Sequence, residues 1–207
     1  LLARLLPWVR PVLGRGGRVA WWGVLLAGIA VAALHRDELG RSLSDLLLAP
    51  GALALALLVY PVIKLVHELA HGCAVKLRGG EVHEIGLMWL LFVPVPYVDA
   101  SAASAFPDKR ARMAVSAAGV RAEAFVAALA MLVWAAVEPG LVRALAYDVT
   151  LIAGVSTLLV NGNPLLRYDG YYWLADLLEM PNLAGRASQQ LGSMLRRRVL
   201  GLEEARR

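Results

Sequence analysis

Four long runs of apolar residues constrain the fold of this chain more than any other feature of its sequence. They cover about residues 19–34, 46–71, 113–137 and 145–160. An α-helix needs about 20 mostly apolar residues to cross the hydrocarbon core of a bilayer. The 207 residues are 59% hydrophobic and 18% charged, which is too apolar for an ordinary water-soluble domain. We therefore predict an all-α membrane protein with about four transmembrane helices.

A shorter apolar segment, GLMWLLFVPVPYV at residues 86–98, separates the second run from the third. It is too short for a spanning helix, and Pro94 and Pro96 would each remove a helical hydrogen bond. We expect this segment to be re-entrant or β-like and to lie close to the functional site. Residues 1–207 are interpreted as one membrane-embedded domain. Because the chain starts with Leu1 and shows no signal-cleavage pattern, we expect it to be part of a longer chain.

The basic residues predict an orientation in the membrane. Most lie before the first run, between the second and third, or after the fourth: Arg4, Arg10, Arg15, Arg18, Lys76, Arg78, Lys109, Arg110, Arg112, Arg186, Arg196, Arg197, Arg198, Arg206 and Arg207. By the positive-inside rule, both termini and the central loop are cytoplasmic. The formal net charge of +5 then reflects topology and contact with the lipid bilayer. No basic stripe interleaves with aromatic residues, so we expect no nucleic-acid partner.

The second run contains the pattern HExxH at His67, Glu68 and His71. Residues four apart share one helical face, so both imidazoles can reach one zinc ion while the glutamate addresses a water bound to it. The alternative is a pair of histidines that hydrogen-bond between helices. Ionisable groups inside a membrane are energetically costly and are therefore candidates for function.

A third metal ligand is needed, because catalytic zinc sites usually have three protein ligands and one open position. The extended pattern HExxHxxGxxH is absent, since Ala74 and Leu77 occupy the required positions. Glu81 and Glu84 are possible ligands, although both follow the RGG turn that should end the helix. A better candidate region is the end of the fourth run.

That region completes a resemblance to the site-2 proteases, a family of intramembrane zinc metallopeptidases. The family combines HExxH with N-x-x-P-x-x-x-x-D-G on a later helix, and this chain has Asn161, Pro164, Asp169 and Gly170 at that spacing. The stretches KLVHELAHG, VPVPYVDAS, AAGVRAE and NPLLRYDGYYWLADLLEMPNL resemble the bacterial branch described as peptide zinc metalloproteases, over about residues 61–183. The chain departs from the family at Val120, where many members have proline.

The resemblance implies that His67, His71 and Asp169 bind Zn²⁺ and that Glu68 is the general base. It also implies a bacterial cytoplasmic membrane, a peptide or membrane-protein substrate, and a transporter or flanking domains of the same chain as further partners. Pro164 and Gly170 are expected to unwind the fourth span locally. Asn161 is interpreted as a residue that binds the substrate backbone or as a helix cap.

Other polar residues in the spans are expected to be structural. Lys64 lies one turn before His67, where it can pair with a carboxylate near the metal or extend towards the membrane surface. Cys73 is interpreted as a small buried hydrophobic residue. Arg121 and Glu123 are expected to form a polar pair in the third span.

The predicted function is a membrane-embedded zinc metalloendopeptidase that cuts a peptide within or next to the bilayer. The first alternative is a non-catalytic membrane subunit that contains a metal and binds or helps to export a peptide. The second is a soluble HExxH protease. A structural zinc site is closed and needs no glutamate beside its first histidine, and this difference favours the enzyme.

The orientation leads to a labelling prediction. A cysteine introduced near Lys109, in a Cys73→Ala background, should react with a membrane-impermeant maleimide only from the cytoplasmic side. A cysteine near Arg143 should react only from the opposite side, because an odd number of spans separates the two positions. Labelling of both positions from the same side would remove one span from the topology.

Overall fold

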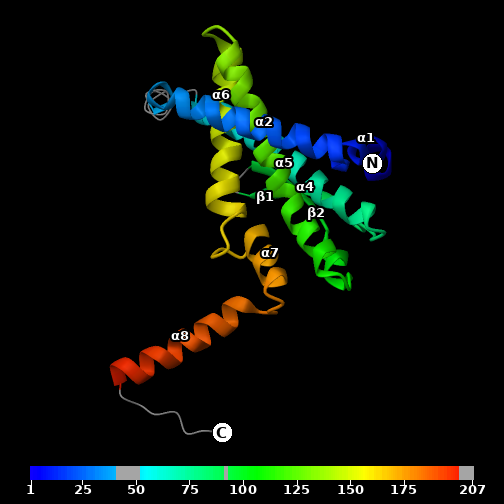
Figure 1. Cartoon of the computed structure of the whole chain (residues 1–207), viewed down its shortest axis with the longest axis vertical. Coiled ribbons are helices and arrows are strands. Elements are labelled where there is room, and N and C mark those ends of the chain that lie inside the picture. The colour runs from blue at the N-terminus through cyan, green and yellow to red at the C-terminus, as the bar shows by residue number, and fades with distance from the viewer. Residues whose placement is uncertain (41–51, 91–92, 201–207) are drawn as a thin grey trace.

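Helices make up most of this protein in the computed structural model, which describes residues 1–40, 52–90 and 93–200. The bounds of the elements are as follows: α1 Leu2–Leu13, α2 Arg15–Leu34, α4 Ala52–Leu77, β1 Ile85–Leu90, β2 Val93–Val98, the 3₁₀ helix η1 Ser101–Ala105, α5 Lys109–Ala136, α6 Leu141–Val155, the π-helical turn η2 Ser156–Asn161, α7 Asp169–Leu177 and α8 Leu183–Leu200. Figure 1 shows α5 and α6 side by side, α2 lying across α5, and α8 extending away from the other helices.

Within the described ranges, four helical segments are long and apolar enough to cross a membrane: Arg15–Leu34, Leu57–Leu77, Lys109–Ala136 and Leu141–Asn161. They correspond to the four predicted spans, although the predicted start of the second span, at residue 46, lies outside the described residues. Large apolar side chains such as Leu26 and Leu58 are 60% and 71% exposed. Apolar surface of this extent is unfavourable in water and suits lipid, so the structure supports a membrane protein.

The helices approach closely where small residues face one another. Gly28 of α2 packs directly on the backbone of Ala128 in α5, and an added Cβ would lie 2.8 Å from the Cα of Ala128. In a membrane, where apolar surface gains little from contact with other protein, close van der Waals packing of small residues holds helices together.

Contacts between charged residues mark the two ends of the bundle. At one end, Nη2 of Arg143, near the start of α6, lies 2.8 Å from Oε1 of Glu38, which follows α2. At the other end, Nε of Arg112, in the first turns of α5, lies 2.6 Å from Oδ1 of Asp176 in α7. The segments that the charge pattern assigns to opposite sides of the membrane therefore lie at opposite ends of the bundle.

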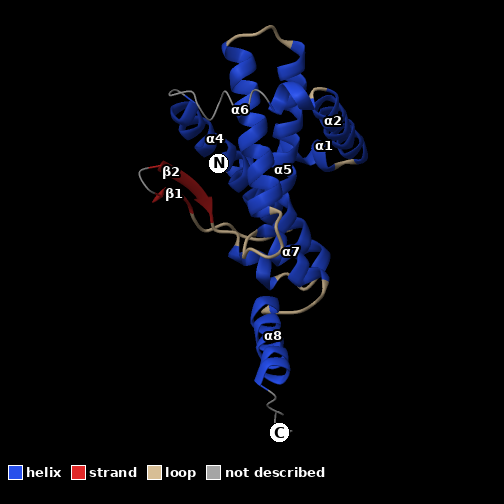
Figure 2. Ribbon diagram, turned by 90° about the vertical axis from the view of Figure 1, so that its left-hand side faces the viewer, coloured by secondary structure: helices blue, strands red, loops and turns tan. Residues whose placement is uncertain are grey.

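The segment expected to be β-like forms an antiparallel hairpin beside α4 (Figure 2). The backbone N–H of Asp99 donates to the carbonyl oxygen of Glu84 (3.0 Å). In an antiparallel pair, residues that hydrogen-bond to the partner strand alternate with residues whose N–H and C=O groups point away from it. Pro94 and Pro96 fall at positions of the second kind, so their backbone nitrogens face away from β1. Proline has no N–H to donate, so these positions tolerate it without losing a hydrogen bond of the ladder. The prediction of extended structure is confirmed, while a re-entrant path through the membrane stays a prediction.

The fourth span ends differently from the expectation. Its last turn, η2, is π-helical, with Gly162 N donating to Thr157 O (2.7 Å). Residues 162–168 leave the helix, and Asp169 begins the separate helix α7. The expectation that Pro164 and Gly170 both unwind one continuous span is therefore wrong for Gly170, because proline ends the span before Gly170 is reached.

The contact between α2 and α5 gives a stability prediction. Replacing Gly28 with leucine should lower the thermal unfolding temperature in detergent, because the side chain would force α2 away from Ala128, at a cost of about 1–3 kcal/mol. Gly23→Leu is the control, since a Cβ at Gly23 meets nothing within 4 Å and the gain in helix propensity is the same. Equal unfolding temperatures for the two variants would contradict the packing described.

Candidate metal centre

Two buried histidines of α4 form one side of the candidate site. His67 and His71 lie one helical turn apart and are 4% and 7% exposed, and their Nε2 atoms lie 3.0 Å from each other. Residues four apart share one helical face, so the HExxH spacing directs both imidazoles to one point, as predicted.

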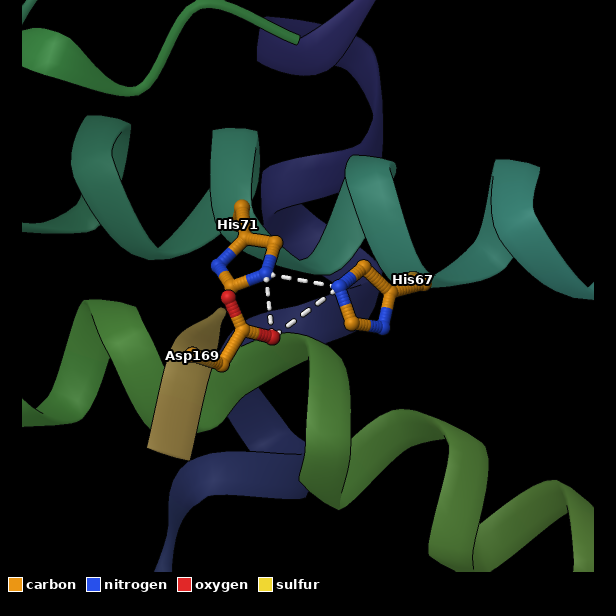
Figure 3. A group of neighbouring side chains, drawn as sticks. All are labelled: His67, His71 and Asp169. Atoms are coloured by element: carbon orange, nitrogen blue, oxygen red, sulfur yellow. Dashed lines mark hydrogen bonds and ion pairs between the residues drawn. The ribbon is translucent and has the colours of Figure 1, made fainter. Parts of the chain in front are cut away.

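Asp169, the first residue of α7, completes the group (Figure 3). Its Oδ2 lies 3.0 Å from Nε2 of His67 and 3.1 Å from Nε2 of His71. The three potential ligand atoms all lie within 4.8 Å of one another.

Two glycines allow the chain to return to the histidines at this point. An added Cβ at Gly170 would lie 2.4 Å from the carbonyl oxygen of Gly162, and one at Gly162 would lie 2.4 Å from the carbonyl oxygen of Thr157. The backbones after η2 and at the start of α7 are therefore in direct contact. This contact fixes the position of Asp169 and explains the glycine that follows it in the sequence.

The other nitrogen of each imidazole faces an acceptor. Nδ1 of His71 lies 2.8 Å from the carbonyl oxygen of Val115. Nδ1 of His67 lies 3.0 Å from Oε1 of Glu123, within ion-pair distance, although the two atoms are not aligned as a hydrogen bond. A neutral imidazole carries one proton, and a proton on Nδ1 points to the carbonyl oxygen of Val115 in His71 and to Glu123 in His67. Both Nε2 lone pairs are then directed at each other and at Asp169.

In that state three electron-pair donors converge, and a bound cation would hold them together. The charges around His67 agree with this, since Glu68, Glu123 and Asp169 are acids and, among the described residues, the lysine that pairs with one of them is Lys64, beside Glu123. With neutral imidazoles, the group carries two uncompensated negative charges, which one divalent cation balances. The donor set of two imidazole nitrogens and one carboxylate oxygen fits a zinc ion.

Gly119 of α5 leaves the space into which these ligand atoms project. An added Cβ there would lie 2.4 Å from Nε2 of His67 and 2.5 Å from Nε2 of His71. Any side chain at this position would occupy the centre of the group. The residue that follows, Val120, lines an adjacent cavity.

Glu68 is partly buried and its carboxylate is held by the hairpin. Its Oε2 accepts a hydrogen bond from the backbone N–H of Val98 in β2 (3.1 Å). The extended segment therefore lies beside the candidate site, as expected. Two other acids considered as metal ligands, Glu81 and Glu84, are exposed beyond the end of α4 and do not join the histidines.

A second polar group lies directly behind His67, and the sequence predicted it only in part, through the possible pairing of Lys64 with a carboxylate. Glu123 is completely buried and lies 2.8 Å from the ammonium group of Lys64. The expected pair of Arg121 and Glu123 is wrong, because residues two apart on a helix point in different directions. Arg121 is exposed and stacks on the ring of Trp21, 5.3 Å from its centroid. A buried acid in an apolar span requires a partner of opposite charge. Lys64, in the second span, was the sequence signal that could have predicted the partner of Glu123.

Asn161 belongs to this second group. It is 6% exposed, and its Nδ2 donates to both carboxylate oxygens of Glu123 (3.2 and 3.1 Å) and to Oγ of Ser156 (3.0 Å). The donors of its amide are thus already engaged within the protein. Contact of Asn161 with a substrate stays a prediction. Cys73 is buried, as expected for a small apolar residue.

A cavity of about 290 Å³ lies beside the metal ligands. Its walls come from α5, the 162–168 connection and α7, and they are formed by Ser116, Ala117, Val120, Gly162, Pro164, Asp169, Gly170, Trp173 and Leu174. Asp169 is the charged residue in this lining. The cavity therefore combines a mostly apolar surface with direct access to one candidate ligand.

Comparisons with protein-family models, with curated proteins and with solved structures found no match to this chain. The chemistry of the site is therefore argued from the residues and contacts described above.

The space at Gly119 gives a prediction about metal binding. Gly119→Ala should weaken zinc binding at least tenfold, because the new methyl group would displace the imidazoles from their positions. The variant should remain helical, since alanine favours a helix. Metal content and zinc affinity of the purified protein in detergent would measure the effect. Gly154→Ala is the control, because a Cβ there meets nothing within 4 Å; equal zinc affinity in both variants would contradict the site.

Proposed function

We propose that this protein is a membrane-embedded zinc metalloendopeptidase of the site-2 protease type, which hydrolyses a peptide bond within or next to the bilayer. The proposal rests on one observation: Asp169 meets the two histidines of the HExxH pattern although it lies 98 residues beyond His71. The two sequence patterns that the family combines thus come together at one group of potential ligands.

His67, His71 and Asp169 would hold the zinc ion, which when bound would polarise the scissile carbonyl group and activate a water as the nucleophile. The contacts of both Nδ1 atoms orient the imidazoles, which is the usual role of groups behind a metal ligand. Three protein ligands leave a position for water and substrate, as in other catalytic zinc sites.

Glu68 is the general base. Its side chain follows that of His67 by about 100° round α4, and the N–H of Val98 holds Oε2 in place. Oε1 takes the proton from the attacking water and later passes it to the leaving amine. The hairpin therefore contributes to the reaction, because it orients the base.

The substrate is a peptide or a segment of a membrane protein. The β1–β2 hairpin enters the bilayer from the cytoplasmic side, an arrangement supported by its exposed apolar side chains, among them Leu87 and Trp89, which are 69% and 76% exposed. The cavity beside Asp169 accommodates an apolar side chain next to the scissile bond. Both termini lie in the cytoplasm and the protein resides in a bacterial cytoplasmic membrane. A transporter or flanking domains of the same chain deliver or remove the peptide.

Replacing Glu68 tests this proposal by separating zinc binding from hydrolysis. Glu68→Gln should retain about one zinc per chain and the native fold, because glutamine preserves size and hydrogen-bonding shape. Its rate of peptide cleavage should fall at least 10²–10⁴-fold, the contribution typical of a positioned base. Cleavage of a mixture of quenched fluorescent peptides in detergent micelles, with zinc content measured in parallel, gives both quantities.

Two variants serve as controls for this measurement. Asp169→Ala should lose most of the zinc together with the activity, whereas Glu138→Gln should retain both, since Glu138 is exposed between α5 and α6, at the end of the bundle that carries Arg143. Undiminished cleavage by Glu68→Gln would exclude the proposed mechanism. A wild-type protein that binds zinc but cleaves nothing, with no difference between variants, would favour a non-catalytic subunit that binds or helps to export a peptide.

A further inference from the structure

Glu123 is the buried acid that the proposed hydrolysis does not use, and its surroundings are unusual for a membrane span. Its side chain has no exposed surface, so water cannot contact either oxygen. Every polar group near the carboxylate in the described part of the chain can donate a proton to it. Lys64, Ser156, Thr157 and Asn161 donate hydrogen bonds to it, and Nδ1 of His67 lies within ion-pair distance without being aligned as a hydrogen bond.

The distances divide these donors between the two oxygens. Oε1 lies 2.8 Å from Nζ of Lys64, 3.2 Å from Oγ of Ser156 and 3.0 Å from Nδ1 of His67. Oε2 accepts from Oγ1 of Thr157 (3.0 Å), and Nδ2 of Asn161 donates to both oxygens. A carboxylate that is surrounded by donors and paired with an ammonium group is held as an anion, and an anion can only accept.

The π-helical turn η2 is what brings these donors together. Ser156 and Asn161 lie five residues apart and point in different directions on an α-helix. In a π-helical turn the hydrogen bonds join residues five apart, so both side chains lie on one face, and Nδ2 of Asn161 donates to Oγ of Ser156 (3.0 Å). The irregular end of the fourth span thus builds a polar pocket for one carboxylate of α5.

We propose that Glu123 is a positioning residue for His67: it keeps the proton of this imidazole on Nδ1 and so directs the Nε2 lone pair to the metal. This inference rests on the proposed zinc site. Lys64 has a supporting role, because its charge allows the carboxylate to remain ionised inside the membrane. Asn161, Ser156 and Thr157 hold the carboxylate at its place behind the ring.

Glu123→Gln would remove the control over the position of the His67 proton. The glutamine amide can turn its NH₂ group towards Nδ1, so that Nδ1 accepts a hydrogen bond. The imidazole proton then moves to Nε2, where it competes with the metal. Partners behind a metal ligand typically change metal affinity 10–100-fold. We expect Glu123→Gln to weaken zinc binding by that factor and to alter the visible absorption bands of the Co²⁺-substituted protein, which depend on the ligand geometry.

A double variant separates this role from simple stabilisation of the fold. Lys64→Met and Glu123→Gln each leave one buried charge without its partner, so both single variants should unfold at a lower temperature. Lys64→Met/Glu123→Gln removes both charges and should recover most of the thermal stability. If Glu123 positions His67, the double variant still binds zinc 10–100-fold more weakly than the wild type. Recovery of wild-type zinc affinity and Co²⁺ spectrum in the double variant would overturn the proposal.

Two further measurements complete the experiment. Asp148→Asn is the control for loss of a buried acid, since Asp148 is 2% exposed in α6 and does not contact the histidines; its zinc affinity should equal that of the wild type. Zinc and Co²⁺ affinities are measured by competition with a chelator in detergent. A wild-type protein that binds neither metal would overturn both the metalloprotease and the role of Glu123, whereas tight binding by the double variant would overturn the role of Glu123 alone.

Discussion

An ionised side chain inside an apolar helix bundle is stable only where opposite charges and hydrogen bonds replace water. In this protein, that constraint organises the centre of the molecule around His67. Nε2 of this imidazole faces Asp169 (3.0 Å), and Nδ1 faces Glu123 (3.0 Å). One ring therefore connects the candidate metal ligands to the buried polar group. Lys64, which lies on α4 like His67, neutralises Glu123. A divalent cation would neutralise the remaining acids.

The site also requires that backbones approach more closely than most side chains allow. Glycine supplies this freedom at three places: Gly119 leaves space for the imidazoles, while Gly162 and Gly170 let the start of α7 contact the end of η2. The glycines are spread over α5, the connection after η2 and the first turn of α7. Each one is needed because its neighbour is backbone or a ligand that cannot move aside.

Irregular structure is concentrated around the site. The π-helical turn η2 gathers the donors to Glu123, the hairpin strand β2 holds Glu68 through the N–H of Val98, and the connection before α7 delivers Asp169. In a bilayer, backbone groups outside regular helices must be satisfied by protein or must line a polar cavity. Their concentration here agrees with a hydrated site where a peptide can bind and be cut, as we propose.

The sequence alone determined the four spans, the extended segment and the pair of histidines, because hydropathy, proline and helical periodicity are local properties. It also singled out Asp169, but only through the resemblance to a family, since no local rule brings residues 98 positions apart together. Tertiary structure alone decided the partner of Glu123, because the neighbours of a buried acid depend on how α4, α5 and η2 pack. It likewise decided that Asp169 begins a separate helix, since the close contact of Gly162 with Gly170 is a contact between backbones.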